Sequence, residues 1–195
     1  MTTPKPTLHV VIGSTRPGRV GEPIARWFFE RSLAHDGFEV ELIDLAQVNL
    51  PLFDEPQQPF RQRYAHEHTK RWSETVQSSD AFVFVIPEYN HSMNAAVKNA
   101  VDFLYVEWHY KPFAIMCYGG PARGLRAAEA LKLSLVALKM PFAGDVGISM
   151  FTNPVADETF SADESLEKAA ASLLGELARL TPVFQALRAP ATKKS

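Results

Sequence analysis

The chain has 195 residues, of which 46% are apolar and 11% aromatic, so it can bury a core without disulfides or a structural metal. Its 20 Lys and Arg residues against 22 Asp and Glu residues give a net charge of −2, which gives no support to a nucleic-acid function. The single cysteine excludes an intrachain disulfide, residues 1–13 lack a signal peptide, and no apolar run approaches the roughly 20 residues that cross a bilayer. We therefore expect a cytoplasmic protein that binds neither nucleic acid nor membrane.

The first half of the chain alternates strands with helices. Residues 7–13 (TLHVVIG) form an apolar run that ends at glycine, which predicts a buried parallel strand. Apolar residues recur every three or four positions over 19–34, as in an amphipathic helix, and alternate with polar ones over 38–45, as in an edge strand. Three prolines make 49–60 a surface excursion, and 64–78 is predicted to be a mostly polar helix.

The second half continues the alternation. Residues 81–86 and 112–118 are apolar runs that predict central strands, the first halted by Pro87 and the second by glycines. The remaining predicted elements are helices over 94–106 and 125–139, a weaker strand over 142–148 and a last helix from about residue 162.

The last predicted helix has its own start and stop signals. Ser161 and Glu164 form a capping box for it, and Pro182 is expected to disturb its end. No internal repeat or low-complexity segment suggests a second domain. We therefore expect one domain over residues 1–188, followed by a flexible tail over residues 189–195.

The alternation of five strands with helices predicts an α/β fold. Such a chain forms an open parallel sheet with right-handed crossovers and helices on both faces. The order of the strands is not determined by the alternation itself. Ligands of open α/β sheets bind outside the carboxyl ends of the strands, so any chemistry is expected on the loops that follow the strands.

The first candidate loop is 13–21 (GSTRPGRVG), which precedes a helix. The helix N-terminus, the hydroxyls of Ser14 and Thr15 and the guanidinium of Arg16 can together hold a phosphate. Arg19 either adds a second cation or lies in solvent on the first helical turn. An ordinary turn is the alternative interpretation of the whole loop. The sequence lacks the glycine patterns of a dinucleotide-binding Rossmann site and of a P-loop NTPase.

The second candidate loop is 87–92 (PEYNHS), after the first central strand. Tyr89 can pack against a flat heteroaromatic ring, and backbone donors around Glu88 and Asn90 can bind its polar edge. The alternative is a plain loop in which Asn90 or Ser92 only caps the next helix.

The third candidate loop is 119–124 (GGPARG), after the other central strand. Its paired glycines, Gly119 and Gly120, allow the backbone to approach a ligand closely. The three loops would converge only if the strands before them are neighbours in the sheet.

Other chemistry-bearing residues give weaker signals. His66 and His68 are two positions apart on a predicted helix, so they cannot share a face as zinc ligands would, and we predict no metal site. Cys117 lies inside a predicted strand, where a cysteine is usually a small buried hydrophobe. No nucleophile elbow or acid and base pair is evident, so we assign no side-chain catalyst.

Four motifs together resemble the NADPH-dependent FMN reductase family. They are the loop 13–21, the segment PEYNHS at 87–92, the helix VKNAVDFL at 97–104, and YGG at 118–120 with GLRAAEAL at 124–131. The resemblance covers roughly residues 7–150, and PEYN after an apolar strand is its most specific element.

The resemblance implies a flavodoxin-like three-layer α/β sandwich, with a five-stranded parallel sheet of order 2-1-3-4-5. It also implies non-covalent FMN, with the phosphate in the first loop, the flavin ring against the second, and the glycines of the third flanking the ring. The implied cofactor-binding residues are Ser14, Thr15, Arg16, Arg19, Val20, Pro87, Glu88, Tyr89, Asn90, Gly119 and Gly120.

The implied activity is an FMN-dependent oxidoreductase that transfers a hydride from NAD(P)H to FMN and then to a small acceptor such as a flavin, quinone or azo compound. Homodimers or homotetramers are implied as well. The chain departs from many relatives at Arg19, where they carry serine, and at Arg123-Gly124, where they have a second glycine pair. Arg123 is expected to narrow the nicotinamide entrance or to change its charge.

Two other classes of protein stay open. An FMN-bound electron carrier or redox-responsive flavoprotein would share the fold without NAD(P)H turnover, although a net charge of −2 gives little support for a charged docking surface. The other class is a plain α/β binding domain without flavin. The sequence predicts neither the acceptor nor a preference between NADPH and NADH.

Overall fold

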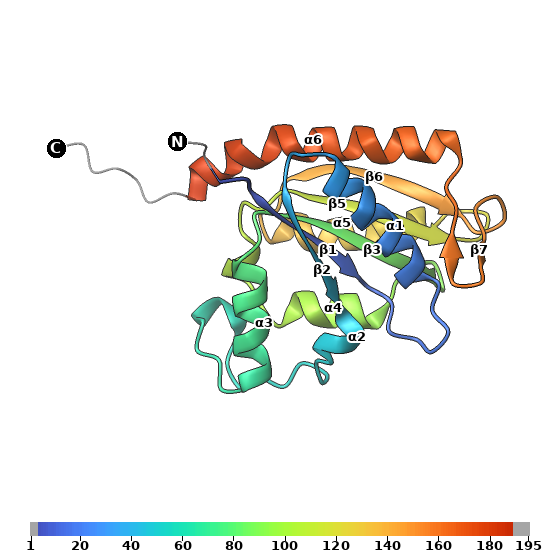
Figure 1. Ribbon diagram of the computed structural model, residues 1–195. Helices are drawn as coiled ribbons and strands as arrows, with labels where there is room; N and C mark the ends of the chain where they lie inside the picture. Colours follow the sequence, from blue (N-terminus) through green and yellow to red (C-terminus); the bar gives the residue numbers. More distant parts are fainter. Residues whose placement is uncertain (1–3, 189–195) are drawn as a thin grey trace.

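A parallel sheet runs through the centre of the protein, with its carboxyl ends facing away from the chain termini (Figure 1). The computed structural model describes residues 4–188, so the predicted tail lies outside the described residues. The strand order is β2-β1-β3-β5-β6, with every pair on this path parallel. This confirms the predicted order of the five main strands. They are β1 (Thr7–Ile12), β2 (Glu39–Asp44), β3 (Ala81–Tyr89), β5 (Phe113–Gly119) and β6 (Phe142–Ser149).

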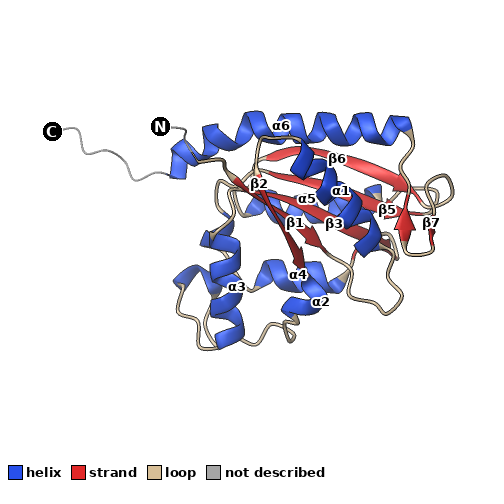
Figure 2. Cartoon of the chain, viewed as in Figure 1, coloured by secondary structure: helices blue, strands red, loops and turns tan. Residues whose placement is uncertain are grey.

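Helices cover both faces of the sheet, which makes the three predicted layers (Figure 2). One face packs against α1 (Gly21–Ala34) and α6 (Glu164–Arg188). The other packs against α3 (Glu67–Gln77), α4 (Ala95–Asp102) and α5 (Leu125–Ala137). No helix within residues 4–188 is both long and apolar enough to cross a membrane.

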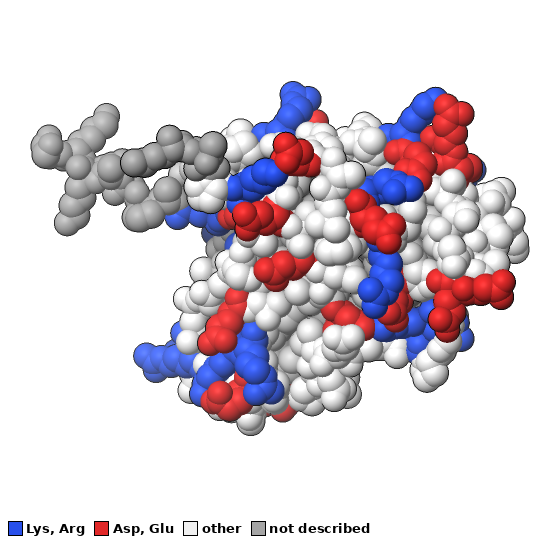
Figure 3. All heavy atoms as spheres, in the orientation of Figure 1, with Lys and Arg blue, Asp and Glu red and all other residues white. Residues whose placement is uncertain are grey.

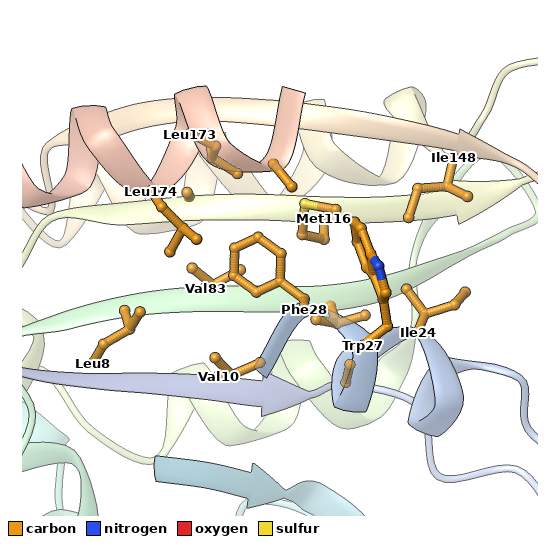
Figure 4. Packing of buried hydrophobic residues seen from close by; sticks show 14 of the residues in the cluster. Leu8, Val10, Ile24, Trp27, Phe28, Val83, Met116, Ile148, Leu173 and Leu174 are labelled. Atoms are coloured by element: carbon orange, nitrogen blue, oxygen red, sulfur yellow. The ribbon is translucent and has the colours of Figure 1, made fainter. Parts of the chain in front are cut away.

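The alternation of strand side chains builds two cores. Figure 4 shows the core under α1 and α6, where Phe28 and Trp27 lie close to Val83 of β3 and Met116 of β5. Phe28, Val83 and Met116 have no exposed surface, so truncating the phenylalanine to alanine would cost about 3–5 kcal/mol. Because both faces are buried, the central strands are continuously apolar, and this explains why the sequence revealed them.

The predicted end of β3 at Pro87 is wrong. The strand continues through Pro87, which pairs with Tyr118 of β5, and reaches Tyr89 before turning into the short antiparallel strand β4 (Ser92–Met93). Since β1 ends at Ile12, opposite Val85, one side of β3 beyond this point is an edge, where proline is tolerated.

The last helix also begins and ends differently from the prediction. Its N-terminus is capped by Asp163, whose Oδ1 accepts a hydrogen bond from the Leu166 backbone at 2.8 Å, and Ser161 lies outside the helix. Pro182 is accommodated, and α6 continues to Arg188. Thr181 Oγ1 hydrogen-bonds to the Leu177 carbonyl at 2.7 Å within this last part of the helix.

Several short elements were not predicted, and one helix was predicted too long. The helix expected over 94–106 ends at Asp102 and is followed by a 3-10 turn. The elements missed are helix α2 (Leu45–Val48), the 3-10 turns at Pro59–Arg61 and Val106–Trp108, and a hairpin of β7 (Val155–Ala156) and β8 (Thr159–Phe160).

Candidate active site

The strand order reverses between β1 and β3, and the three candidate loops lie together at this end of the sheet. The Gly13 backbone donates to the Val85 carbonyl at 2.9 Å, joining the first loop to β3. The Asn94 amide donates to the Gly13 carbonyl at 2.6 Å, so the segment after β4 is joined to the same loop. The loops therefore converge at the site that open α/β sheets use for ligands.

Ser14 occupies a buried position at the base of the first loop. Its hydroxyl has no hydrogen-bond partner within residues 4–188, although the Tyr118 hydroxyl lies beside it. A Cβ at Gly21 would come within 2.4 Å of both hydroxyl oxygens, so glycine makes their approach possible. Burial raises the pKa of Tyr118 above its ordinary value, which keeps this phenol protonated. The hydroxyl of Ser14 is thus a buried polar group that is left for a ligand.

Thr15 and Arg16 lie at the surface, at the front of the first loop. Both are exposed, and the Arg16 guanidinium has no ion-pair partner in the part of the chain that the structure describes. Thr15 also lines a cleft of about 320 Å³ together with Asn49 and Asn99. Arg16 is therefore available to an anion at the start of α1.

Arg19 is engaged by the protein itself. Its guanidinium contacts both carboxylate oxygens of Asp44 at 2.6 and 2.5 Å, the Ser14 carbonyl at 2.7 Å and Glu22 at 3.0 Å. The hydrogen bond to Asp44 raises the pKa of Arg19 above its ordinary value. Arg19 thus fixes the loop to the end of β2, and Val20 follows it, half-buried.

The second loop is the tip of the β3–β4 hairpin. Asn90 and His91 have φ values of 49° and 64°, the left-handed conformation that a two-residue type I′ turn requires at both positions. Neither is glycine, and such strain is concentrated at functional sites. Tyr89 is 40% exposed beside them.

Glu88 points away from the hairpin tip and joins the second loop to the third. Its carboxylate accepts hydrogen bonds from the Arg126 guanidinium at 2.9 Å and from the Arg126 backbone at 3.2 Å, in the first turn of α5. Pro87 precedes it in the sheet. The four residues Pro87 to Asn90 are therefore a strand end held at one side by α5.

The third loop is crowded at its first glycine. A Cβ at Gly119 would come 3.1 Å from the Gly124 nitrogen and 3.3 Å from the Glu88 Cβ, whereas Gly120 has more space. Arg123 has a left-handed φ of 55° and lines a cleft of about 440 Å³ with Asp145 and Asp163, between β6 and α6. Arg123 thus lines a cleft that also contains two carboxylates.

Sequence reasoning missed three residues that shape the site. Tyr118 and Gly21 belong to the motifs named above. The sequence does not show that they pack together around the Ser14 hydroxyl, because this contact joins distant parts of the chain. Asn94 is buried, and its Oδ1 has no partner among the described residues. Its position directly before a helix was the one available signal, and that signal is shared by every N-cap.

The two histidines lie differently from the prediction. His66 precedes α3 in an extended conformation, so its ring stacks on that of His68 at 5.1 Å, and His68 Nε2 is 2.9 Å from Asp54 Oδ1. Within residues 4–188, no cluster of three or more His, Cys, Asp or Glu side chains is arranged to hold a metal ion. Burial raises the pKa of Cys117 to about 12, so its thiol stays protonated.

The site fits the cofactor that the motifs imply. A buried hydroxyl and an exposed guanidinium that have no partner among residues 4–188, together with a helix N-terminus, suit a phosphate. A glycine turn near an exposed tyrosine suits a flat ring. Fold and site together define an FMN-binding α/β protein of the flavodoxin-like class.

Comparison with known proteins gives the family. The model of the NADPH-dependent FMN reductase family matches residues 6–153, so the chain belongs to this family. The NAD(P)H-dependent FMN reductase ntnL of Nectria sp is 40% identical over 143 residues, which cover 70% of this chain and 71% of that protein. A quinone reductase of Pseudomonas putida is 33% identical over 141 residues, covering 69% and 72%.

A solved structure confirms the fold. FerB, a flavoenzyme NAD(P)H:(acceptor) oxidoreductase from Paracoccus denitrificans, superimposes with a TM-score of 0.68 at 22% identity, covering 92% of this chain and 98% of FerB. The chain is thus an enzyme, an FMN-dependent oxidoreductase that takes its electrons from NAD(P)H.

Proposed function

We propose that the enzyme reduces a small, flat acceptor such as a quinone, an azo compound or a free flavin at the carboxyl edge of β1, β3 and β5. The observation that carries this proposal is the convergence of the three loops, with a buried hydroxyl at Ser14 and an exposed guanidinium at Arg16. The similarity to a quinone reductase supports the choice of acceptor. Bound FMN would supply the redox chemistry, as hydride acceptor and then donor.

The residues of the chain then act by binding and positioning. Ser14, Thr15 and Arg16 would hold the phosphate at the start of α1, where the helix dipole favours an anion. Arg19 is retained as a proposed contact, and its pairing with Asp44 also keeps the loop in place. The other proposed cofactor contacts are Val20, Pro87, Glu88, Tyr89, Asn90, Gly119 and Gly120. No side chain is assigned an acid or base role.

A homodimer or homotetramer is part of the proposal. Leu133 is 78% exposed on the outer face of α5, and Val136 is exposed one turn later. Nearby, Phe60 and Tyr105 line an open cleft of about 460 Å³. An apolar surface of this kind is typical of a subunit contact. Light scattering would measure the assembly.

Two further predictions belong to this proposal, one on domain organisation and one on location in the cell. One domain over residues 1–188 is supported by the single main sheet that both cores share. A cytoplasmic location is supported by a lone, buried thiol at Cys117. Limited proteolysis and cell fractionation would test them.

The test of the activity is anaerobic. FMN is added to the purified protein, excess is removed, and the flavin absorbance is followed after addition of NADPH or NADH. Rapid bleaching by either nucleotide is expected, and the two rates give the donor preference. Bleaching by dithionite but by neither nucleotide would indicate an electron carrier instead. Figure 3 shows acidic and basic side chains interspersed on the visible face, so this face has no large area of one sign of the kind that a carrier's docking surface uses.

A further inference from the structure

Phe151 is an exposed aromatic residue next to the third loop. It follows β6, whose carboxyl end lies beside that of β5, and 74% of it is exposed. A Cβ placed on Gly120 would lie 3.7 Å from the Phe151 ring. The loop after β6 therefore contributes a fourth wall to a site that the motifs located on three loops.

The turn that carries Phe151 is held by hydrogen bonds. The Met150 backbone donates to the Gly119 carbonyl at 3.0 Å, and the Asn153 backbone donates to the Ser149 carbonyl at 2.9 Å. Asn153 is buried, and its side chain donates to Asp163 at 3.3 Å. The ring is thus presented to solvent from a fixed backbone, which reduces the entropy that a contact with a ligand would cost.

The glycine turn lies between the strand end that precedes Tyr89 and the turn that carries Phe151. Gly119 lies between Glu88 of β3 and Ser149 of β6. One position further along, Gly120 lies beside the Phe151 ring, and Tyr89 follows Glu88 on the other side of the glycines. A flat ring above the glycines would have the phenol of Tyr89 on one side and the Phe151 ring on the other. Aromatic pairs of this kind add binding energy beyond the area that they bury.

We propose that Phe151 is a specificity-determining residue that contacts the ring of an aromatic acceptor. This proposal rests on the proposed function, because it needs FMN in the three-loop site. Tyr89 belongs to the cofactor side of the site by its place in the second loop. Phe151 lies beside Gly120, in the turn after β6, and that turn supplies no predicted cofactor contact. A ring on Phe151 thus favours planar, unsaturated acceptors over small inorganic ones.

The experiment compares Phe151→Ala, Phe151→Leu and Phe151→Tyr in the FMN-loaded enzyme. Binding of 1,4-naphthoquinone to the oxidised protein is measured by calorimetry, without turnover, and the Kd of FMN is measured by fluorescence titration. Leu187→Ala is the control, since Leu187 is 61% exposed on α6 and precedes Arg188, which binds Asp80 at the amino end of the sheet. The ratio of kcat/KM for naphthoquinone to that for ferricyanide gives a second readout.

We expect the naphthoquinone Kd to rise about five-fold in Phe151→Ala, to rise less in Phe151→Leu, and to return to within about two-fold of wild type in Phe151→Tyr. The kcat/KM ratio should fall by a similar factor, and Leu187→Ala should leave the Kd unchanged.

Three results would overturn the proposal. Equal naphthoquinone affinity in all variants would show no contact, an equal loss of FMN affinity would make Phe151 a cofactor residue, and a changed oligomeric state would make it a subunit contact. Wild-type protein that takes up no FMN would refute the proposed function as well, so the two failures are distinguishable.

Discussion

The two ends of the sheet differ in how their charged side chains are paired. At the amino end, charged side chains are bound by the protein, as in Arg188 to Asp80 at 2.5 Å. At the carboxyl end, Ser14 has a buried hydroxyl without a partner among residues 4–188, and Arg16 points to solvent. The comparison teaches that paired charged groups secure the fold, whereas unpaired polar groups that gather where three loops converge mark where a ligand completes the structure.

Lys111 is a buried charged residue at the amino end of the sheet whose Nζ is bound by backbone carbonyls. It is only 5% exposed, and its Nζ donates to the carbonyls of Val76 and Gln77 at 2.6 and 3.1 Å, which belong to the last turn of α3. Helix ends leave such carbonyls without an intrahelical partner, so the lysine caps the helix.

The largest expected effect is on stability and comes from Lys111→Ala. The substitution leaves the buried Val76 carbonyl and the part-buried Gln77 carbonyl without their donor and opens a cavity, so we expect the free energy of unfolding to fall by roughly 3 kcal/mol. Urea denaturation measures this change. Lys98→Ala is the control, because its pair with Asp102 is exposed and contributes at most about 0.5 kcal/mol. A Kd for FMN that rose along with the instability would break the separation between the two ends.

The second prediction concerns His9, which is 1% exposed in β1. Burial, together with repulsion by Lys111, lowers the pKa of His9 to about 4, although Asp80 opposes this shift. Glu41 Oε2 lies 3.3 Å from Nε2, and neither ring nitrogen has a hydrogen-bond partner within residues 4–188. His9 is thus a buried polar group for which burial favours the neutral form.

The unfolded chain takes up a proton near pH 6.5, whereas native His9 does so only near pH 4. Its contribution to stability is therefore fully present above pH 6.5 and is lost as the pH falls to 4, by about 2–3 kcal/mol. Denaturation curves at several pH values would show this slope in the wild type and a shallower one in His9→Leu. Identical slopes in the two proteins would contradict the assignment.

Local patterns revealed the strands and helices, and a resemblance supplied their order, but contacts between distant residues stayed hidden. Arg19 was expected either on the phosphate or in solvent, because Asp44, its partner, is 25 positions away in the chain. Pro87 was expected to end a strand, since the sequence does not show that β1 stops short of it. The loops themselves were found because glycines and hydroxyls mark backbone that must bend or bind.

The third prediction concerns Arg16, at the carboxyl end of the sheet. Arg16→Ala should weaken FMN binding by about 1.5–3 kcal/mol, the scale of a charge-assisted hydrogen bond. Because Arg16 is exposed and has no ion-pair partner in the described chain, the unfolding free energy of the apoprotein should change by less than about 0.5 kcal/mol. Fluorescence titration with FMN and urea denaturation measure the two quantities. Unchanged FMN affinity would remove Arg16 from the site.

The smallest expected effect comes from Gly21→Ala. A Cβ here would crowd the hydroxyls of Ser14 and Tyr118 at 2.4 Å, so the loop must shift, and we expect FMN affinity and apoprotein stability each to fall by about 1–2 kcal/mol. Gly175→Ala is the control, since a Cβ there meets nothing within 4 Å and alanine favours a helix. Adding Tyr118→Phe to Gly21→Ala removes one of the crowded oxygens and should recover part of the loss. If the rescue fails, the crowding acts through Ser14 alone. The double variant Gly21→Ala with Ser14→Ala would then measure how much of the FMN binding energy depends on the Ser14 hydroxyl.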